Sequence, residues 1–155
     1  MATNKDLQKR LKEELETMFK DYRMKGEDGK STPFHFYEGA APIPKTDEDP
    51  TFIPYMVART AAGKVPDDNY GFTTARALII VATYENDEAY PSNTDVLQII
   101  DKIIERFQTH PSMGAYTRTG DIEWTLSDED TYPYFFGGVE LSFILPTIFR
   151  EDEYA

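Results

Sequence analysis

The stretch ALIIVATYENDEAYPSNTDVLQIIDKIIERF, from Ala77 to Phe107, decides the fold. Its first part, Ala77 to Thr83, is a nearly unbroken apolar run rich in branched residues, which is typical of a strand buried on both faces. Its last part, which begins at Asp95, has the apolar spacing of an amphipathic helix. A strand buried on both faces needs cover on each side, and the following helix can supply one cover.

A second helix is predicted near the start of the chain, over residues 4–24. Thr3 or Asn4 can cap it, because both side chains accept hydrogen bonds from the first turn. Its polar positions mix both signs of charge, whereas a helix on a membrane surface usually has a basic polar face. The stripe is therefore predicted to meet the core or another subunit. The apolar positions at helical spacing are Leu7, Leu11, Leu15, Met18 and Tyr22.

Five segments have the composition of strands, and the last two alternate between apolar and polar residues. Pro54 cannot donate a ladder hydrogen bond, which argues for an edge position or a bulge at the start of its strand. The last two strands are close enough along the chain to form an antiparallel hairpin. The predicted strands are residues 34–37, 51–59, 76–84, 121–127 and 134–146.

These elements predict an α+β fold, with a mixed, mainly antiparallel sheet of four to five strands and two amphipathic helices packed on it. At 155 residues the chain is expected to form a single domain, residues 1–155. Its parts are the helix at about 4–24, the sheet and helix core at about 34–146, and a short acidic tail at 150–155.

The charge and composition narrow the possible partners. The net charge is −12, so direct binding to free nucleic acid is not expected, because phosphate contacts need patches of Lys and Arg. There is no cysteine for disulfide or thiol chemistry. The start of the chain lacks the apolar core of a signal peptide, and no apolar run approaches the roughly 20 residues of a membrane span. We expect no contact with a membrane.

The residues that usually carry catalysis or bind metals are not arranged for it. The acidic clusters at 47–49 and 128–130 lack the alternating ligands and central glycine of a calcium loop, and we interpret them as solvated loop charge. Neither His35 nor His110 has a second ligand at zinc spacing. No nucleophile elbow and no phosphate-binding loop is present. We therefore expect no cofactor and no enzymatic activity, although 28 acidic residues could supply a carboxylate pair by chance.

The remaining unusual features are aromatic residues and long loops. The rings of residues 132–136 can pack under a loop at the edge of the core, or they can form a contact surface for another subunit. The loops at 38–50 and 60–74 are longer than is common in compact domains, unless they bind something. The candidate subunit or tube contacts are Tyr132, Tyr134, Phe135, Phe136, Ile43, Tyr70 and Phe72.

Three segments together resemble a known family. PTFIPYMVARTAAGKV (residues 50–65) resembles a strand followed by a loop, and residues 77–107 resemble a strand, turn and helix. DIEWTLSDEDTYPYFFGGVELSFILP (residues 121–146) resembles a closing hairpin in which YPYFFG leads into the final strand. In this order they resemble the tail terminator, or tail completion, proteins found in the neck of long-tailed bacteriophages and prophages.

The resemblance implies a structural function in the virion. Such proteins form a ring, typically six-fold, that caps the tail tube and offers the joining surface for the head connector. The implied partners are further copies of the chain, the tail tube and head-connector proteins. The implied location is the virion, assembled in the cytoplasm of the host bacterium. An acidic lumen would repel DNA rather than hold it, which suits a conduit.

Three alternatives remain. A head-completion or minor capsid protein would also ring the channel, but many of these are largely helical. A small soluble α+β ligand-binding or regulatory module would show a closed apolar pocket with a few polar groups. An enzyme would need a cleft that holds two acids with perturbed pKa values.

Overall fold

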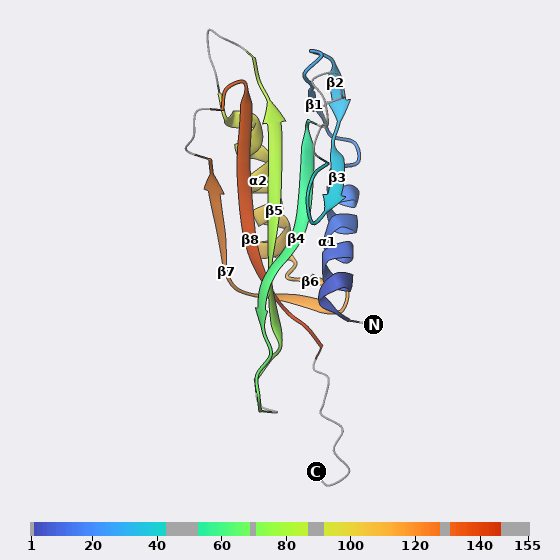
Figure 1. The fold of residues 1–155 in the computed structure, drawn as a ribbon, viewed down its shortest axis with the longest axis vertical. Helices are drawn as coiled ribbons and strands as arrows, with labels where there is room; N and C mark the ends of the chain where they lie inside the picture. Colours follow the sequence, from blue (N-terminus) through green and yellow to red (C-terminus); the bar gives the residue numbers. More distant parts are fainter. Residues whose placement is uncertain (1, 43–52, 69–70, 87–91, 128–130, 147–155) are drawn as a thin grey trace.

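A computed structural model describes residues 2–42, 53–68, 71–86, 92–127 and 131–146 (Figure 1). Over these residues the chain has an α+β fold with two helices, a six-stranded curled mixed sheet and a separate two-stranded sheet. The large sheet has the order β3-β4-β5-β8-β7-β6, and only its β3–β4 pair runs parallel. The α+β class and the two helices are as predicted, but the strands are more numerous.

The additional strands are short. The pair β1–β2 and the two-residue β6 had no periodicity long enough to be recognised in the sequence. The elements are α1 (Asn4–Phe19), β1 (Arg23–Lys25), β2 (Ser31–Pro33), β3 (His35–Glu38), β4 (Tyr55–Lys64), β5 (Thr74–Tyr84), α2 (Thr94–Thr109), β6 (Ser112–Met113), β7 (Tyr116–Leu126) and β8 (Tyr134–Ile144).

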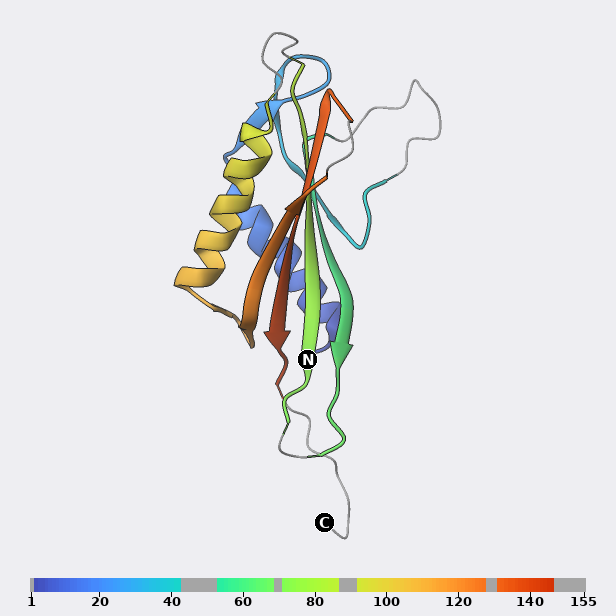
Figure 2. The same cartoon turned by 90° about the vertical axis from the view of Figure 1, so that its left-hand side faces the viewer.

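The central strand β5 lies between β4 and β8 and is antiparallel to both. Its odd-numbered residues face the helices, and Ala77, Ile79 and Val81 are fully buried there. Figure 2 shows both helices on the same side of the sheet. The expectation of a strand covered on both faces is therefore wrong. On the other side Leu78 and Ile80 are only half-buried and Arg76 is exposed, because neither of the two described helices lies over that side (Figure 2).

The core lies between this helix-facing side and the two helices. Helix α1 begins as predicted, since the Thr3 hydroxyl accepts a hydrogen bond from the Asp6 N–H at 3.1 Å. Helix α1 ends at Phe19 rather than near Met24, because residues 23–25 pair with β2 in the small sheet. The fully buried helix residues are Leu7, Leu11, Leu15, Phe19, Val96, Ile99, Ile100, Ile103 and Phe107. Neither described helix is long and apolar enough to cross a membrane.

Strand β4 differs from its prediction in position and length. It starts at Tyr55, directly after Pro54, and it is an interior strand between β3 and β5 rather than an edge. Pro54 lies outside the strand, so β4 needs no N–H from it, and its carbonyl accepts a hydrogen bond from the His35 N–H at 3.0 Å. Strand β4 also continues to Lys64, into the segment predicted to be loop.

The predicted closing hairpin is confirmed, since β7 and β8 pair antiparallel. Strand β7 begins at Tyr116, five residues earlier than predicted, and its register shifts between Thr119 and Glu123. Gly120 has a φ of 71° at this irregularity, a conformation that favours glycine. The pairing is regular again from Glu123 to Leu126, which sets the side-chain rows described next.

Candidate functional site

The side of the large sheet that faces away from the helices is here called the open face. The strand register places the side chains of paired residues next to one another, so that they form rows across the strands. One row consists of Tyr55, Ala82 and Phe136. The next consists of Val57, Ile80, Gly138 and Thr125. The third consists of Arg59, Leu78, Glu140 and Glu123.

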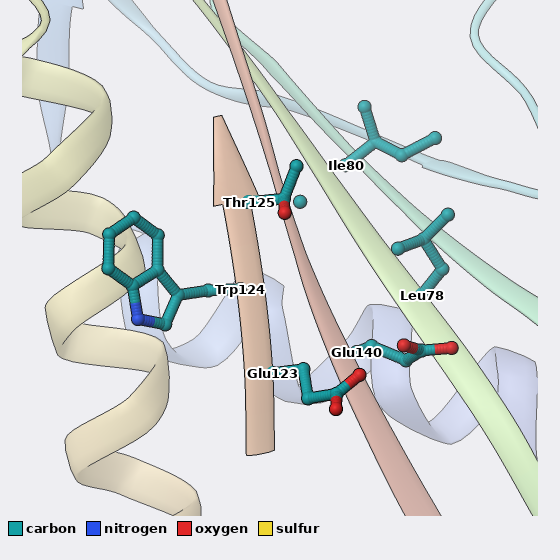
Figure 3. A pocket seen from close by; sticks show the side chains of 7 residues that line it. Leu78, Ile80, Glu123, Trp124, Thr125 and Glu140 are labelled. Carbon is teal, nitrogen blue, oxygen red and sulfur yellow. The ribbon is translucent and has the colours of Figure 1, made fainter. Parts of the chain in front are cut away.

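The middle row is interrupted at Gly138, which has no side chain. A hollow of about 300 Å³ lies over it, open to solvent, and is here called the Gly138 hollow. Figure 3 shows Leu78 and Ile80 on one side of it and Glu123 and Thr125 on the other. The neighbouring Trp124 also contributes to the lining, but its side chain points to the opposite side of β7. The floor is therefore mainly apolar and the rim carries carboxylates.

The carboxylates at the rim are Glu123 and Glu140, which are direct partners across β7 and β8. Like charges opposite one another in a sheet are unfavourable. Arg76 offsets one of them, since its Nε lies 2.7 Å from a Glu140 carboxylate oxygen. Among the described residues Glu123 makes no ion pair. The Gly138 hollow thus presents negative charge beside an apolar floor.

The predicted aromatic contacts in β8 divide between the two faces of the sheet. Phe135 faces the helices and packs against the core, with its ring centroid 6.5 Å from that of Tyr132. Tyr134 and Phe136 lie on the open face, and the Tyr134 ring is 5.6 Å from Tyr84. A hydrogen bond with the Glu27 carboxylate, together with burial, raises the pKa of Tyr134 to about 12. The packing interpretation is therefore confirmed for Phe135. A contact between these rings and another subunit stays a prediction.

The paired ends of β4 and β5 extend beyond the helices as an arm (Figure 1), here defined as residues 61–68 and 71–74. Two large apolar side chains are exposed on it, Val65 at 78% and Phe72 at 63%. A side chain on Gly63 would place a Cβ 2.6 Å from the Thr74 carbonyl oxygen, so glycine lets the two strands approach closely here. Phe72 was predicted as a contact, whereas Ile43 and Tyr70 lie outside the described residues.

A second hollow of about 350 Å³ lies on the outer surface between α1 and α2. Met18 and Tyr22 line it from α1 and the segment after it, and Lys102 and Arg106 line it from α2. The Lys102 Nζ lies 5.3 Å from the Tyr22 ring centroid, and a hydrogen bond with Tyr22 raises the pKa of Lys102. The Arg106 Nε donates to a Glu14 carboxylate oxygen at 2.6 Å, which joins the two helices. This hollow is explained as part of the helix packing.

The described residues hold no group of three or more His, Cys, Asp or Glu side chains placed to bind a metal ion. His35 lies in β3, and His110 follows the end of α2. The acidic clusters at 47–49 and 128–130 lie outside the described residues.

Reasoning from the sequence missed the Gly138 hollow. The alternation of β8 was predicted, but alternation alone does not show what lies over either glycine of the strand. The structure places Gly137 under α2, where a Cβ would lie 2.7 Å from Ile100 Cδ1. Gly138 faces the other way. Only the register between β5, β8 and β7 shows that its row borders Ile80 and Thr125.

No protein-family model matches this chain, and no curated protein matches it. Its function is therefore argued from the sequence resemblance and from the two exposed apolar features, the arm and the Gly138 hollow.

Proposed function

We propose that the protein is a virion structural protein that caps the tail tube of a long-tailed bacteriophage or prophage. In this function it forms a ring, typically six-fold, and offers the joining surface for the head connector. The observation that carries the proposal is the presence of two unlike apolar features at separate places, the exposed arm and the open face. The sequence resemblance of residues 50–65, 77–107 and 121–146 to tail terminators supplies the biological setting.

A ring requires two different surfaces on every subunit. In a heterologous interface one surface of each copy meets a different surface of the next, and the assembly closes if the rotation between copies allows it. A subunit with a single apolar patch would favour a two-fold dimer instead. The arm carries Val65 and Phe72, and the open face carries Leu78 and Ile80, so the chain offers both partners of such an interface.

The charge of the chain supports a structural role around DNA rather than a grip on it. A net charge of −12 disfavours phosphate contacts, as a conduit for DNA requires. The proposal includes no cofactor, no membrane contact and no enzymatic activity. It places the protein in the virion, after assembly in the cytoplasm of the host bacterium.

Two other functions are less well supported. A ligand-binding module would enclose its ligand, whereas the Gly138 hollow is open and shallow. A head-completion protein would form a ring by the same logic, but the six-stranded sheet contrasts with the largely helical character of many such proteins. The tail terminator is therefore the function that we adopt.

The test is the mass of the full chain in solution, measured by light scattering over a concentration series and combined with negative-stain imaging. We expect closed rings of uniform subunit number to appear as the concentration rises. A two-fold dimer, or a monomer without rings at the highest concentration reached, would contradict the proposal. Imaging of the largest species separates closed rings from open filaments, which a heterologous contact also permits.

A further inference from the structure

We propose that neighbouring copies of this chain join by inserting the tip of the β4–β5 arm of one copy into the Gly138 hollow of the next. This inference rests on the proposed ring and specifies its contact. The occupant of the hollow is a second copy of this chain, with Phe72 as the inserted side chain and Val65 beside it.

The arm tip has the properties of an inserted group. Phe72 and Val65 are the two most exposed large apolar side chains among the described residues. Aromatic side chains dominate interface energies, because they bury a large rigid area at low cost in conformational entropy. Water around these two side chains is released only when another surface covers them.

The Gly138 hollow has the properties of a receptor for one side chain. At about 300 Å³ it lies at the lower end of the range for small-ligand sites, which suits one aromatic ring rather than a peptide. Leu78 and Ile80 supply apolar contacts, and the missing side chain of Gly138 leaves the space. Thr125 and Glu123 on β7 form the opposite wall.

One charge on each feature is opposite in sign to a charge on the other, with Lys64 on the arm and Glu123 at the rim of the hollow. Lys64 is exposed on the arm next to Val65 and makes no ion pair among the described residues. Glu123 at the rim of the hollow is likewise without an ion pair there, so it can accept the lysine when the tip inserts. The tip also carries Asp67 and Asp68, and a carboxylate oxygen of Asp68 accepts a hydrogen bond from the Gly71 N–H at 2.9 Å.

The contact must form between copies. Thr74, two residues after Phe72, pairs with Ile144, whereas the hollow lies at Gly138. Six residues of β8 separate these two register positions, which is about 20 Å at the usual strand rise. An arm cannot fold back over this distance, because its β4 and β5 ends are held in the sheet. The two features are unlike and far apart, so the contact is heterologous.

Disulfide trapping tests the contact directly, because the chain contains no cysteine. Asp67→Cys, at an exposed position on the arm that leaves Phe72 and Val65 in place, and Thr125→Cys are prepared as separate full-length variants. A tag on one of them makes the three possible dimers differ in mass. The mixture is oxidised at a concentration where the wild-type chain assembles. We expect the mixed dimer to form at least about tenfold faster than either dimer of a single variant, since a disulfide needs Cα atoms within about 7 Å.

The matched control replaces Thr125→Cys by Glu105→Cys, which lies on the exposed side of α2. Mixed with Asp67→Cys, this control is expected to link only at the rate of random collision. Equal rates for the Thr125 and Glu105 pairs would overturn the proposed contact. If wild-type rings are seen under the same conditions, that result leaves the proposed function standing; if the wild type does not assemble at all, both proposals fall.

A second variant fills the hollow from within. Gly138→Val places methyl groups over Leu78 on the open face and leaves the helix-facing core untouched. We expect the melting temperature to be kept and the association constant to fall at least about tenfold, the effect of losing one interface anchor. Unchanged assembly by a folded Gly138→Val chain would overturn the inference. Phe72→Ser is expected to weaken assembly by a similar factor.

Discussion

Gly137 and Gly138 are neighbours in β8, but they lie on opposite sides of the sheet and leave space for different things. A Cβ at Gly137 would meet Ile100, Leu126 and Val96 within 3.1 Å, because α2 packs closely above it. A Cβ at Gly138 would meet only Leu78, at 3.4 Å, and the Ile79 carbonyl oxygen, at 3.7 Å. Gly137 therefore allows α2 to pack closely on the sheet, whereas Gly138 leaves a hollow that no described side chain occupies.

The same contrast holds for the two faces of the sheet as a whole. The helix-facing side is closed by α1 and α2 and holds most of the buried apolar residues. Neither described helix lies above the open face, where neighbouring side chains shield one another (Figure 2). Stability should therefore depend mainly on the first side, and association on the second.

The largest expected effect comes from consecutive isoleucines of β5. Ile79 faces the helices and is 0% exposed, whereas Ile80 faces the hollow and is half-buried. We expect Ile79→Ala to lower the free energy of unfolding by about 2–5 kcal/mol, through lost burial and a cavity. Ile80→Ala is expected to cost about 1 kcal/mol or less. Urea unfolding measures the loss of stability in both variants. Equal losses would show that the open face is buried as completely as the helix-facing side.

The second-largest expected effect on stability comes from substitutions at Gly137 and Gly138. Gly137→Ala is expected to destabilise the fold by about 1–3 kcal/mol, because Ile100 must move away from the new methyl group. Gly138→Ala is expected to be neutral or to stabilise it by about 0.5 kcal/mol, because alanine loses less backbone entropy on folding. Thermal unfolding of both variants shows whether each substitution lowers or raises the stability of the fold. A larger loss of stability in Gly138→Ala than in Gly137→Ala would contradict the presence of open space above Gly138.

Ion pairs on the two sides of the sheet should also contribute unequally to the free energy of unfolding, with the larger contribution on the helix-facing side. The Arg106–Glu14 pair joins the helices, with side chains that are 19% and 13% exposed, and the Arg106 guanidinium also donates to the Ser112 carbonyl at 3.1 Å. Arg106→Ala is expected to cost about 1–3 kcal/mol. Arg76→Ala breaks the more exposed pair with Glu140 and is expected to cost under about 1 kcal/mol. Denaturation midpoints at low and high salt should separate the two, with only the Arg76 effect strongly reduced by salt.

The smallest effect appears only at alkaline pH. Tyr116 is buried, and its hydroxyl donates to an Asp6 carboxylate oxygen at 2.5 Å. Burial and this hydrogen bond raise the pKa of Tyr116 to about 12, above its ordinary value of 10.0. The folded state therefore binds the Tyr116 hydroxyl proton more tightly than the unfolded state does. The resulting contribution to the free energy of unfolding is complete below pH 10 and is lost as the pH rises toward 12.

The measurement is the urea midpoint of the wild type and of Tyr116→Phe between pH 9 and pH 12. We expect the wild type to lose stability more steeply than the variant across the window from 10 to 12. Parallel profiles would show that the tyrosine does not contribute. Tyr134→Phe, on the open face, is the matched comparison, because its pKa is raised to about the same value by Glu27.

Much of the fold could be predicted, and the misses have physical causes. Helix α2 was predicted from Asp95 onward, because its apolar face repeats over four turns, and it begins one residue earlier, at Thr94. The start of β4 was misjudged, because Pro54 was taken as part of the strand rather than as the residue before it. The arm was predicted to be a loop, because Gly63, Pro66, Asp67, Asp68 and Gly71 are typical of turns. Pairing with β5 nevertheless extends β4 through Ala62, Gly63 and Lys64.

The sequence by itself determined the α+β class, the two amphipathic helices, the apolar strand at 77–83, the β7–β8 hairpin and an acidic surface without cysteine. These follow from local periodicity and composition, which report how each segment is buried. The tertiary structure decided that both helices cover one side of the sheet, that β4 is interior, and that Gly138 lies beside Ile80 and Thr125. Such choices depend on pairing between segments distant in the chain, because a strand's own pattern does not specify which neighbours share its row.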